Sequence, residues 1–197
     1  MVSAGLLSVD VFFYLGGFFM AFVFMREKSR SLMLYPVAIL QRMLRIWPAY
    51  LVTILFFYSV LPHLGSGPKW GPLVESVQTC RTMWRPLLFV DNLIDNGNGM
   101  CLQWGWYLQV DFQIFLVCLF LLGVYRVNNY VSMGISGLLI IGSWVFNMMY
   151  TQNHSTRLFT DPSSFMTFMT YFLDVYIKPY ARWTTYILGT YLGLLYC

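Results

Sequence analysis

The feature that most restricts the fold is a series of apolar runs long enough to cross a lipid bilayer. The first, AGLLSVDVFFYLGGFFMAFVFM, covers residues 4–25, and about 20 apolar residues span the hydrocarbon core as a helix. Four further windows cover residues 46–64, 106–125, 130–150 and 182–197. A weaker apolar stretch at 165–177 suits an interfacial or re-entrant helix. The sequence therefore predicts one all-α domain over residues 1–197, a polytopic transmembrane helix bundle with about five spans, or six with the interfacial helix.

Composition supports a membrane protein and excludes two other classes. Only 10% of the 197 residues are charged and 58% are hydrophobic, whereas soluble domains carry about a quarter charged residues. Membrane lipids are therefore expected partners. No basic patch with interleaved aromatic residues is present, so nucleic acid is not an expected partner. His63, His154 and the cysteines show no spacing typical of metal ligands, so no metal site is expected.

Cationic residues in the short connections indicate the sidedness of the chain. The connection after the first span, together with the turn after the third, carries Arg26, Lys28, Arg30, Arg42, Arg45 and Arg126. The basic segment 26–45 and Arg126 are therefore placed on the cytosolic or matrix side. The long loop 65–105, in which acids balance the cations, is placed on the non-cytosolic side. This pattern fits the mitochondrial inner membrane, an endomembrane or the plasma membrane equally well.

The long loop contains two cysteines, Cys80 and Cys101. If the loop faces an oxidising compartment, these cysteines are expected to form a disulfide. A disulfide that closes a loop of this length contributes about 3 kcal/mol in the chain-entropy model. The alternative is two free thiols in an interfacial loop. Cys118 and Cys197 fall within predicted helices, where cysteine usually packs as a small apolar residue.

Two carboxylates, Asp10 and Asp111, stand inside the predicted spans. A charge at the bilayer centre costs about 2.5–3.5 kcal/mol on insertion scales, so both side chains should face other helices or a cavity. Each is either a structural ion pair or hydrogen-bonded group, or part of a functional site. Arg42 and Arg45 lie one turn apart before the second span, where they anchor the chain or reach inward. Pairing of these arginines with Asp10 is not expected, because Asp10 lies nearer the opposite leaflet.

Three smaller features have mainly structural interpretations. Gly189 and Gly193 form a GxxxG pattern, which is typical of close helix packing in membranes. The aromatic run around Trp104 suits a belt at the membrane interface. His63 stands at the outer end of the second span without a motif around it, and is interpreted as an interfacial residue.

Four segments carry a family resemblance through their order and residues: SVDVFFYLGGFFMAF, QRMLRIWPAYL, the cysteine-bounded loop that leads into WGWYLQVDFQ, and KPYARWTTYILGTYLGLL. In that order they resemble the VDxFFxxSGF, RxxRIxPxY, WxWYLxxDxQFY and KPxxRxxPYxxGxxxG motifs of the acyltransferase-3 superfamily, in its nose-resistant-to-fluoxetine-like branch. The matching positions beyond the two aspartates are Arg42, Arg45, Pro48, Tyr50, Trp106, Tyr107, Gln113, Lys178, Pro179 and Arg182. The chain departs from the motifs at Gly16, where Ser is usual, and at Thr185, where Pro is frequent.

The resemblance implies transfer of an acyl group from acyl-CoA to a hydroxyl acceptor. Asp10, Arg42, Arg45 and Asp111 are then the candidate catalytic residues. Arginines suit the phosphates of acyl-CoA or a developing oxyanion. No cofactor is required, and acyl-CoA is the donor if the chain is catalytic. The reaction also needs a general base, and the family is thought to use a histidine in a helix ahead of VDxFF, which the 197 residues do not include.

Two functions are compatible with a chain that matches the family motifs at most positions and departs from them at others. In the first, the chain is a non-catalytic pseudoenzyme that serves as an accessory subunit of a larger membrane complex, for example a respiratory-chain assembly. Other transmembrane subunits would then cover its polar helix faces. In the alternative, it is an active membrane O-acyltransferase, or half of a split one, with a lipid or small hydroxyl compound as acceptor. The missing histidine and the polar faces favour the first.

Overall fold

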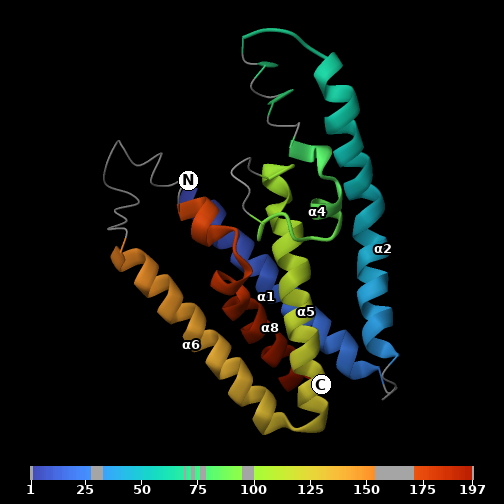
Figure 1. Ribbon diagram of the computed structural model, residues 1–197. Helices are drawn as coiled ribbons and strands as arrows, with labels where there is room; N and C mark the ends of the chain where they lie inside the picture. Colours follow the sequence, from blue (N-terminus) through green and yellow to red (C-terminus); the bar gives the residue numbers. More distant parts are fainter. Residues whose placement is uncertain are drawn as a thin grey trace. The chain divides into compact units, whose positions relative to one another are not determined.

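The computed structural model describes residues 2–27, 33–68, 70–71, 74–75, 79–94, 100–153 and 171–196 (Figure 1). Regular structure in these residues is helical throughout, which confirms the all-α prediction. Helical segments long and apolar enough to cross a membrane cover Ser8–Arg26, Leu34–His63, Trp106–Val127 and Asn129–Gln152. The chain divides into two compact units, one formed by Met1–Ser29 with Gln113–Cys197 and the other by Arg30–Phe112.

The first unit is a group of packed helices. It consists of α1 (Val2–Arg26), the larger part of α5 (Trp106–Val127), α6 (Asn129–Asn153) and α8 (Trp183–Leu195). In Figure 1, α8 runs beside α1, and these two helices form the most extensive contact between elements of the unit. The N-terminal end of α8 is also joined to α6, because the indole Nε1 of Trp183 donates to the carbonyl of Leu139 at 3.0 Å.

Glycines allow the backbones of α1 and α8 to touch. A Cβ atom added to Gly189 would lie 2.0 Å from the carbonyl oxygen of Tyr14, and one added to Gly17 would lie 2.2 Å from that of Tyr186. A Cβ on Gly193 would meet a carbonyl oxygen of α1 at 2.5 Å. Side chains are excluded at all three positions, so the helix-packing interpretation of the GxxxG pattern is confirmed.

Hydroxyl groups line the contact between α6 and α8. Ser132 and Ser136 are buried on one face of α6, and both lie within hydrogen-bond distance of the Tyr191 hydroxyl, at 3.1 and 2.8 Å. The hydroxyl of Ser136 also donates to the Ser132 carbonyl within the helix. These groups have no water to bond with inside a bilayer, so their mutual hydrogen bonds stabilise the helix pair.

The second unit is built on one long helix and the disulfide-closed loop. Helix α2 (Leu34–Leu55) continues through a π-helical turn (Phe56–Val60) into a 3-10 turn (Leu61–His63), and the loop contains the short helix α4 (Trp84–Leu87). The disulfide between Cys80 and Cys101 is present, with their Cα atoms 4.4 Å apart, which confirms the predicted pairing. It lies in a buried cluster with Tyr50, Ile54, Phe89, Leu102 and Phe112.

Phe89 adopts an unusual backbone conformation at the centre of this cluster. Its φ of 57° lies in the left-handed region, which a bulky residue rarely occupies. The ring is stacked on Phe112 with centroids 4.5 Å apart, and on Tyr50 at 6.2 Å. Full burial of this ring between two aromatic neighbours offsets the backbone cost.

Helix α2 begins earlier than the apolar window indicated, and this changes the position of two arginines. The second span was expected from residue 46, but the helix starts at Leu34, so Arg42 and Arg45 lie inside α2 rather than in a basic connection. Hydropathy excluded this segment because it is charged. Pro36 does not interrupt this helix, because it stands in the first turn, where the missing N–H would have no intrahelical partner.

The C-terminal part of the chain differs from the expected count of spans. The fifth expected span corresponds to α8, which has 13 residues, fewer than the roughly 20 that cross the hydrocarbon core. Of the weaker stretch 165–177, residues from Tyr171 are described, and Phe172–Tyr176 forms a π-helical turn.

His154 and Cys197 lie outside the described residues. Cys118 is fully buried in α5, as its packing interpretation expected.

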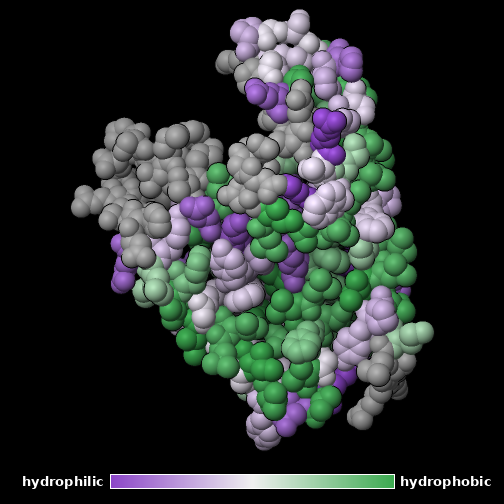
Figure 2. Space-filling view, in the orientation of Figure 1, coloured by the Kyte–Doolittle hydropathy of each residue, from purple (hydrophilic) through white to green (hydrophobic). Residues whose placement is uncertain are grey.

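The outer surfaces of the long helices are apolar. Figure 2 shows hydrophobic residues over most of the helical surface on the side in view. Exposed large apolar side chains in α1, α2 and α6 include Phe12, Phe19, Val23, Leu40, Leu44, Val52, Leu138, Trp144 and Met148. Surfaces of this kind are stable against lipid tails or other transmembrane helices, so the chain is an integral membrane protein.

Replacement of both disulfide cysteines by serine is expected to lower the free energy of unfolding by about 3 kcal/mol, since the bond no longer restricts the unfolded loop. The Cys80→Ser/Cys101→Ser double variant and the parent protein should be compared in detergent by denaturant titration, with and without reductant. The parent should lose the same stability on reduction, and Cys118→Ser should respond to reductant as the parent does. Equal stability of reduced and oxidised parent protein would contradict this expectation.

Candidate functional site

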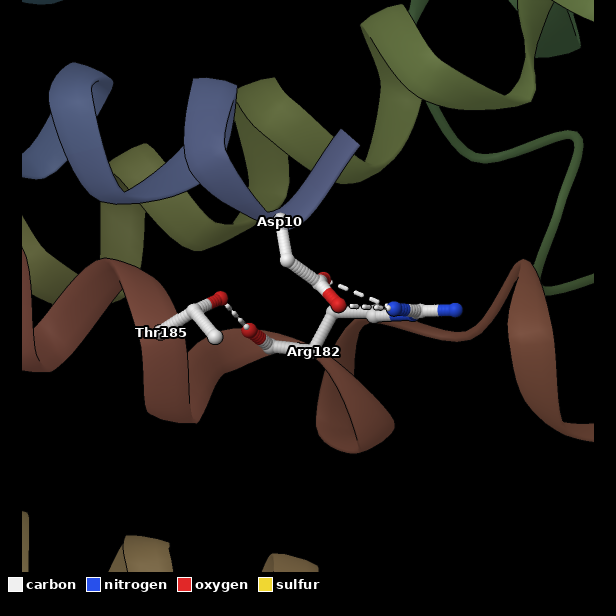
Figure 3. Close-up of polar contacts among 3 residues, drawn as sticks. All are labelled: Asp10, Arg182 and Thr185. Atoms are coloured by element: carbon white, nitrogen blue, oxygen red, sulfur yellow. Dashed lines mark hydrogen bonds and ion pairs between the residues drawn. The ribbon is translucent and has the colours of Figure 1, made fainter. Parts of the chain in front are cut away.

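The first candidate site joins two family-motif residues from opposite ends of the chain. Arg182 precedes α8 and donates from Nη1 to both carboxylate oxygens of Asp10 in α1, at 2.7 and 2.8 Å (Figure 3). The side chains are 13% and 26% exposed. The Arg182 guanidinium also lies over the Tyr176 ring, 3.9 Å from its centroid, in a cation–π contact. Asp10 is thus an ion-pair partner, one of the two roles that its sequence position allowed.

A neighbouring hydrogen bond fixes the backbone beside Arg182. The Thr185 hydroxyl donates to the Arg182 carbonyl at 3.0 Å (Figure 3). The residue that stands in place of the motif proline therefore helps to hold the arginine, even though it is a departure from the motif.

The second candidate site joins α2 to the beginning of α5. Arg42 in α2 donates from Nη2 to Oδ2 of Asp111 in α5, with side-chain exposures of 23% and 14%. Arg45 lies one turn further along α2, is exposed, and has no hydrogen bond or ion pair with any described residue. The two arginines of the RxxR motif are thus in different environments. Arg42 neutralises a partly buried carboxylate, whereas Arg45 presents its charge at the surface.

A third polar group connects the disulfide-closed loop to α2 and α5. The fully buried Gln109 accepts a hydrogen bond from the backbone N–H of Asn92 at 2.7 Å and donates to the Tyr50 hydroxyl at 3.3 Å. Beside it, the Asp91 carboxylate accepts from the backbone N–H of Cys101 at 2.8 Å. None of the sequence motifs assigned a role to Gln109, Asp91 or Asn92. The amide side chain of Gln109 inside a predicted span was the available signal.

The Asp91 carboxyl lies in the loop, outside the membrane-spanning segments. Burial raises the pKa of this carboxyl, while the N–H of Cys101 and the guanidinium of Arg85 act in the opposite direction. With one carboxylate oxygen bonded to the backbone next to the disulfide, Asp91 holds the loop end in place. The network as a whole fixes the connection between loop and helices.

The remaining motif residues lie outside the two ion pairs. Trp106 and Tyr50 are buried, whereas Pro48 is exposed on α2 and Tyr107 and Gln113 are half-buried in α5. Lys178 and Pro179 form the turn that leads to Arg182, where the Lys178 N–H donates to the Val175 carbonyl at 3.1 Å. His63 ends the long α2 segment, and its Nδ1 lies 3.0 Å from the Ser59 carbonyl.

The first and second candidate sites are both ion pairs. The described residues contain two ion pairs, and each joins an aspartate of one family motif to an arginine of another. Within the same residues, no three His, Cys, Asp or Glu side chains lie together as a metal site would require. The fold and these sites define a helical membrane protein whose motif charges bind one another across helix contacts.

Comparison with known proteins identifies the class more closely. The acyltransferase domain family matches residues 1–197, and the chain belongs to this family. Nose resistant to fluoxetine protein 6 of Caenorhabditis elegans is 28% identical over 206 residues, a match that covers 93% of this chain and 24% of that protein. The chain thus spans about a quarter of the length of this curated relative. No solved structure matches the chain.

Replacement of Gln109 by leucine is expected to lower the free energy of unfolding by about 1–3 kcal/mol, because the Asn92 N–H and the Tyr50 hydroxyl would lose their buried partner. Tyr50→Phe is the matched control, since it removes a single hydroxyl from the same network and should cost less. Both variants should be compared with the parent by thermal unfolding in detergent. Equal melting temperatures for Gln109→Leu and the parent would contradict a structural role of the network.

Proposed function

We propose that this chain is the motif-bearing helical scaffold of an acyltransferase-type membrane bundle, that it packs against further transmembrane helices, and that it does not transfer acyl groups by itself. The observation that carries the proposal is the pairing of motif charges. Asp10 is bound by Arg182 and Asp111 by Arg42. An ion pair between a carboxylate and a guanidinium on two segments fixes the orientation of those segments, and this is a structural role.

The requirements of acyl transfer point the same way. A hydroxyl acceptor needs a general base within hydrogen-bond reach, and both intramembrane carboxylates are already engaged by arginine. His63 stands at the end of its helix with Nδ1 against a backbone carbonyl. The other histidine lies outside the described residues. A base supplied by helices outside this segment would complete the reaction centre.

Packing against other helices is supported by the surfaces of the unit that holds Asp10. Asp10 is 26% exposed in a membrane-spanning helix, and contact of an ionised group with hydrocarbon is costly. Neighbouring helices or a water-filled cavity between helices would remove that contact. The apolar outer faces of α1 and α6 are suited to the same neighbours.

One observation favours a second candidate, an active acyltransferase that uses acyl-CoA. Arg45 is exposed and has no partner among the described residues, one turn from Arg42. A free guanidinium at this position suits a bidentate contact with a phosphate of acyl-CoA. In this candidate, Arg45 would bind the donor, and the chain would act as part of a catalytic bundle.

Two measurements on the same preparation test the proposal. The chain is extracted in mild detergent and its native mass is determined with mass spectrometry of co-migrating proteins, and acyl-CoA turnover is then assayed with lipid and small hydroxyl acceptors. We expect co-migration with other transmembrane proteins, and no turnover by the chain reconstituted alone in nanodiscs. Turnover by the chain alone, reduced at least tenfold in Arg45→Gln, would establish the second candidate and overturn the first.

A further inference from the structure

A carboxylate that has no ion-pair partner among the described residues lies beside tyrosine rings at the C-terminal end of α6. Asp174, in the π-helical turn Phe172–Tyr176, is exposed, and its Oδ2 accepts a hydrogen bond from the Tyr150 hydroxyl at 3.0 Å. The two ion pairs found among the described residues involve other carboxylates. Among the residues that the structure describes, Asp174 therefore accepts a hydrogen bond from one neutral donor, and none of them donates to its other carboxylate oxygen.

Further aromatic rings lie next to the Tyr150 ring that bonds this carboxylate. Tyr150 and Tyr171 are tilted at 58° with centroids 6.3 Å apart, so the two rings are neighbours without being stacked. Phe146 continues the aromatic surface along α6, 6.4 Å from Tyr150, and packs edge-on against Tyr180 at 4.6 Å. Burial raises the pKa of Tyr180, and the nearby Asp174 carboxylate acts in the same direction.

The site lies where α6 leaves the membrane. The spanning part of α6 ends at Gln152, so Tyr150 belongs to its last turn. Tyrosine side chains are concentrated at this depth in membrane proteins, where lipid headgroups meet the helix ends. A cation at headgroup level would therefore reach Asp174 without entering the hydrocarbon core.

The combination of groups selects one kind of ligand. Aromatic faces attract cations through their quadrupoles, and cages of such rings are the usual means of binding quaternary ammonium groups. A divalent metal would need several oxygen ligands, and a single carboxylate is present among these residues. A quaternary ammonium group has no N–H to donate, so it needs the charge of Asp174 and the ring faces rather than further acceptors.

We propose that Asp174, Tyr150 and Tyr171 bind a quaternary ammonium cation at the membrane surface, the trimethylammonium group of a choline compound. The carboxylate supplies the opposite charge, and the two tilted rings contact the methyl groups. The cation belongs either to the headgroup of phosphatidylcholine or to a soluble choline compound. This binding site does not depend on the proposed scaffold function, and it is tested by cation binding alone.

Tetramethylammonium is the probe that tests the site. The full chain is reconstituted in phosphatidylglycerol nanodiscs and titrated with tetramethylammonium chloride, with tyrosine fluorescence as the readout. We expect saturable binding that weakens at least tenfold in Asp174→Asn, which keeps an acceptor for the Tyr150 hydroxyl but removes the charge. Tyr171→Leu removes one ring face and should weaken binding severalfold. Tyr150→Phe keeps its ring and should bind within about threefold of the parent.

The matched control is Tyr130→Leu, a change of an exposed tyrosine at the other end of α6. It should leave binding unchanged, and the helical circular dichroism of every variant should equal that of the parent. Absence of saturable binding by the parent would overturn the proposal. Equal binding by Asp174→Asn and the parent would also overturn it, and this exposed, near-isosteric change leaves the packing intact.

The lipid composition of the nanodisc distinguishes the two sources of the cation. If phosphatidylcholine occupies the site, tetramethylammonium should bind at least tenfold more weakly in phosphatidylcholine than in phosphatidylglycerol nanodiscs, and the difference should disappear in Asp174→Asn. If binding to the parent is equally strong in both lipids and still depends on Asp174, the ligand is a soluble quaternary ammonium compound. Both outcomes support the ammonium site, and each identifies a different source.

Discussion

Gly189→Ala is expected to lower the free energy of unfolding by about 2–3 kcal/mol, near the upper end of typical overpacking costs. The added Cβ would lie 2.0 Å from the Tyr14 carbonyl oxygen, and this neighbour belongs to the backbone of α1 rather than to a movable side chain. The two helices would therefore have to separate along their contact. The effect should be measured by unfolding in mixed micelles of mild detergent and dodecyl sulfate, with circular dichroism as the signal.

Gly142→Ala provides a matched control for this experiment. Gly142 also stands in a membrane-spanning helix, α6, but a Cβ added there meets no atom within 4 Å. Because alanine favours the helix by up to about 1 kcal/mol over glycine, this variant should be as stable as the parent or more stable. Equal unfolding curves for Gly189→Ala and Gly142→Ala would show that the close backbone contact does not limit stability.

Arg182→Gln is expected to lower the free energy of unfolding by about 2–3 kcal/mol, because Asp10 would remain in a membrane helix without its counter-ion. The loss should stay below that of a fully buried pair, since the Asp10 side chain is 26% exposed. Asp10→Asn should also destabilise the protein. The double variant Asp10→Asn/Arg182→Gln should lose less than the sum of the two single changes, because it leaves no unpaired charge.

Arg45→Gln is the control for the loss of a single arginine. Arg45 is exposed and unpaired among the described residues, so its replacement should change stability by no more than about 0.5 kcal/mol. The same unfolding measurement is made on the parent protein, the two single variants of the ion pair, their double variant and Arg45→Gln. Strict additivity of Asp10→Asn and Arg182→Gln would contradict an energetic coupling between these residues, and would leave the ion pair without a role in joining α1 to the start of α8.

Together these experiments separate two ways in which the helices are held. Loss of stability in Gly189→Ala reports on backbone packing, and coupling between Asp10 and Arg182 reports on charge pairing. A scaffold depends on both for its stability. In an active bundle, the ion pair would additionally affect acyl transfer, so the Arg182→Gln variant should be included in the turnover assay described for the proposed function.

The sequence by itself determined the class of this protein and several local features. Runs of about 20 apolar residues leave a helical bundle as the stable form, since a bilayer offers no hydrogen bonds to an unpaired backbone. The disulfide between Cys80 and Cys101 and the close packing at Gly189 were predicted correctly. Four motifs in the right order led to the correct family. Each of these depends on local residue pattern.

Only the tertiary structure decided which charges meet. Asp10 pairs with Arg182, far away in the sequence, and Asp111 pairs with Arg42. Hydropathy also placed the start of the second span too late, since α2 begins at Leu34. A hydropathy window counts Arg42 as a charged residue and takes no account of its neutralisation by Asp111 on another helix. Charge pairing depends on which helix faces touch, and this is a property of the packed fold rather than of any one segment.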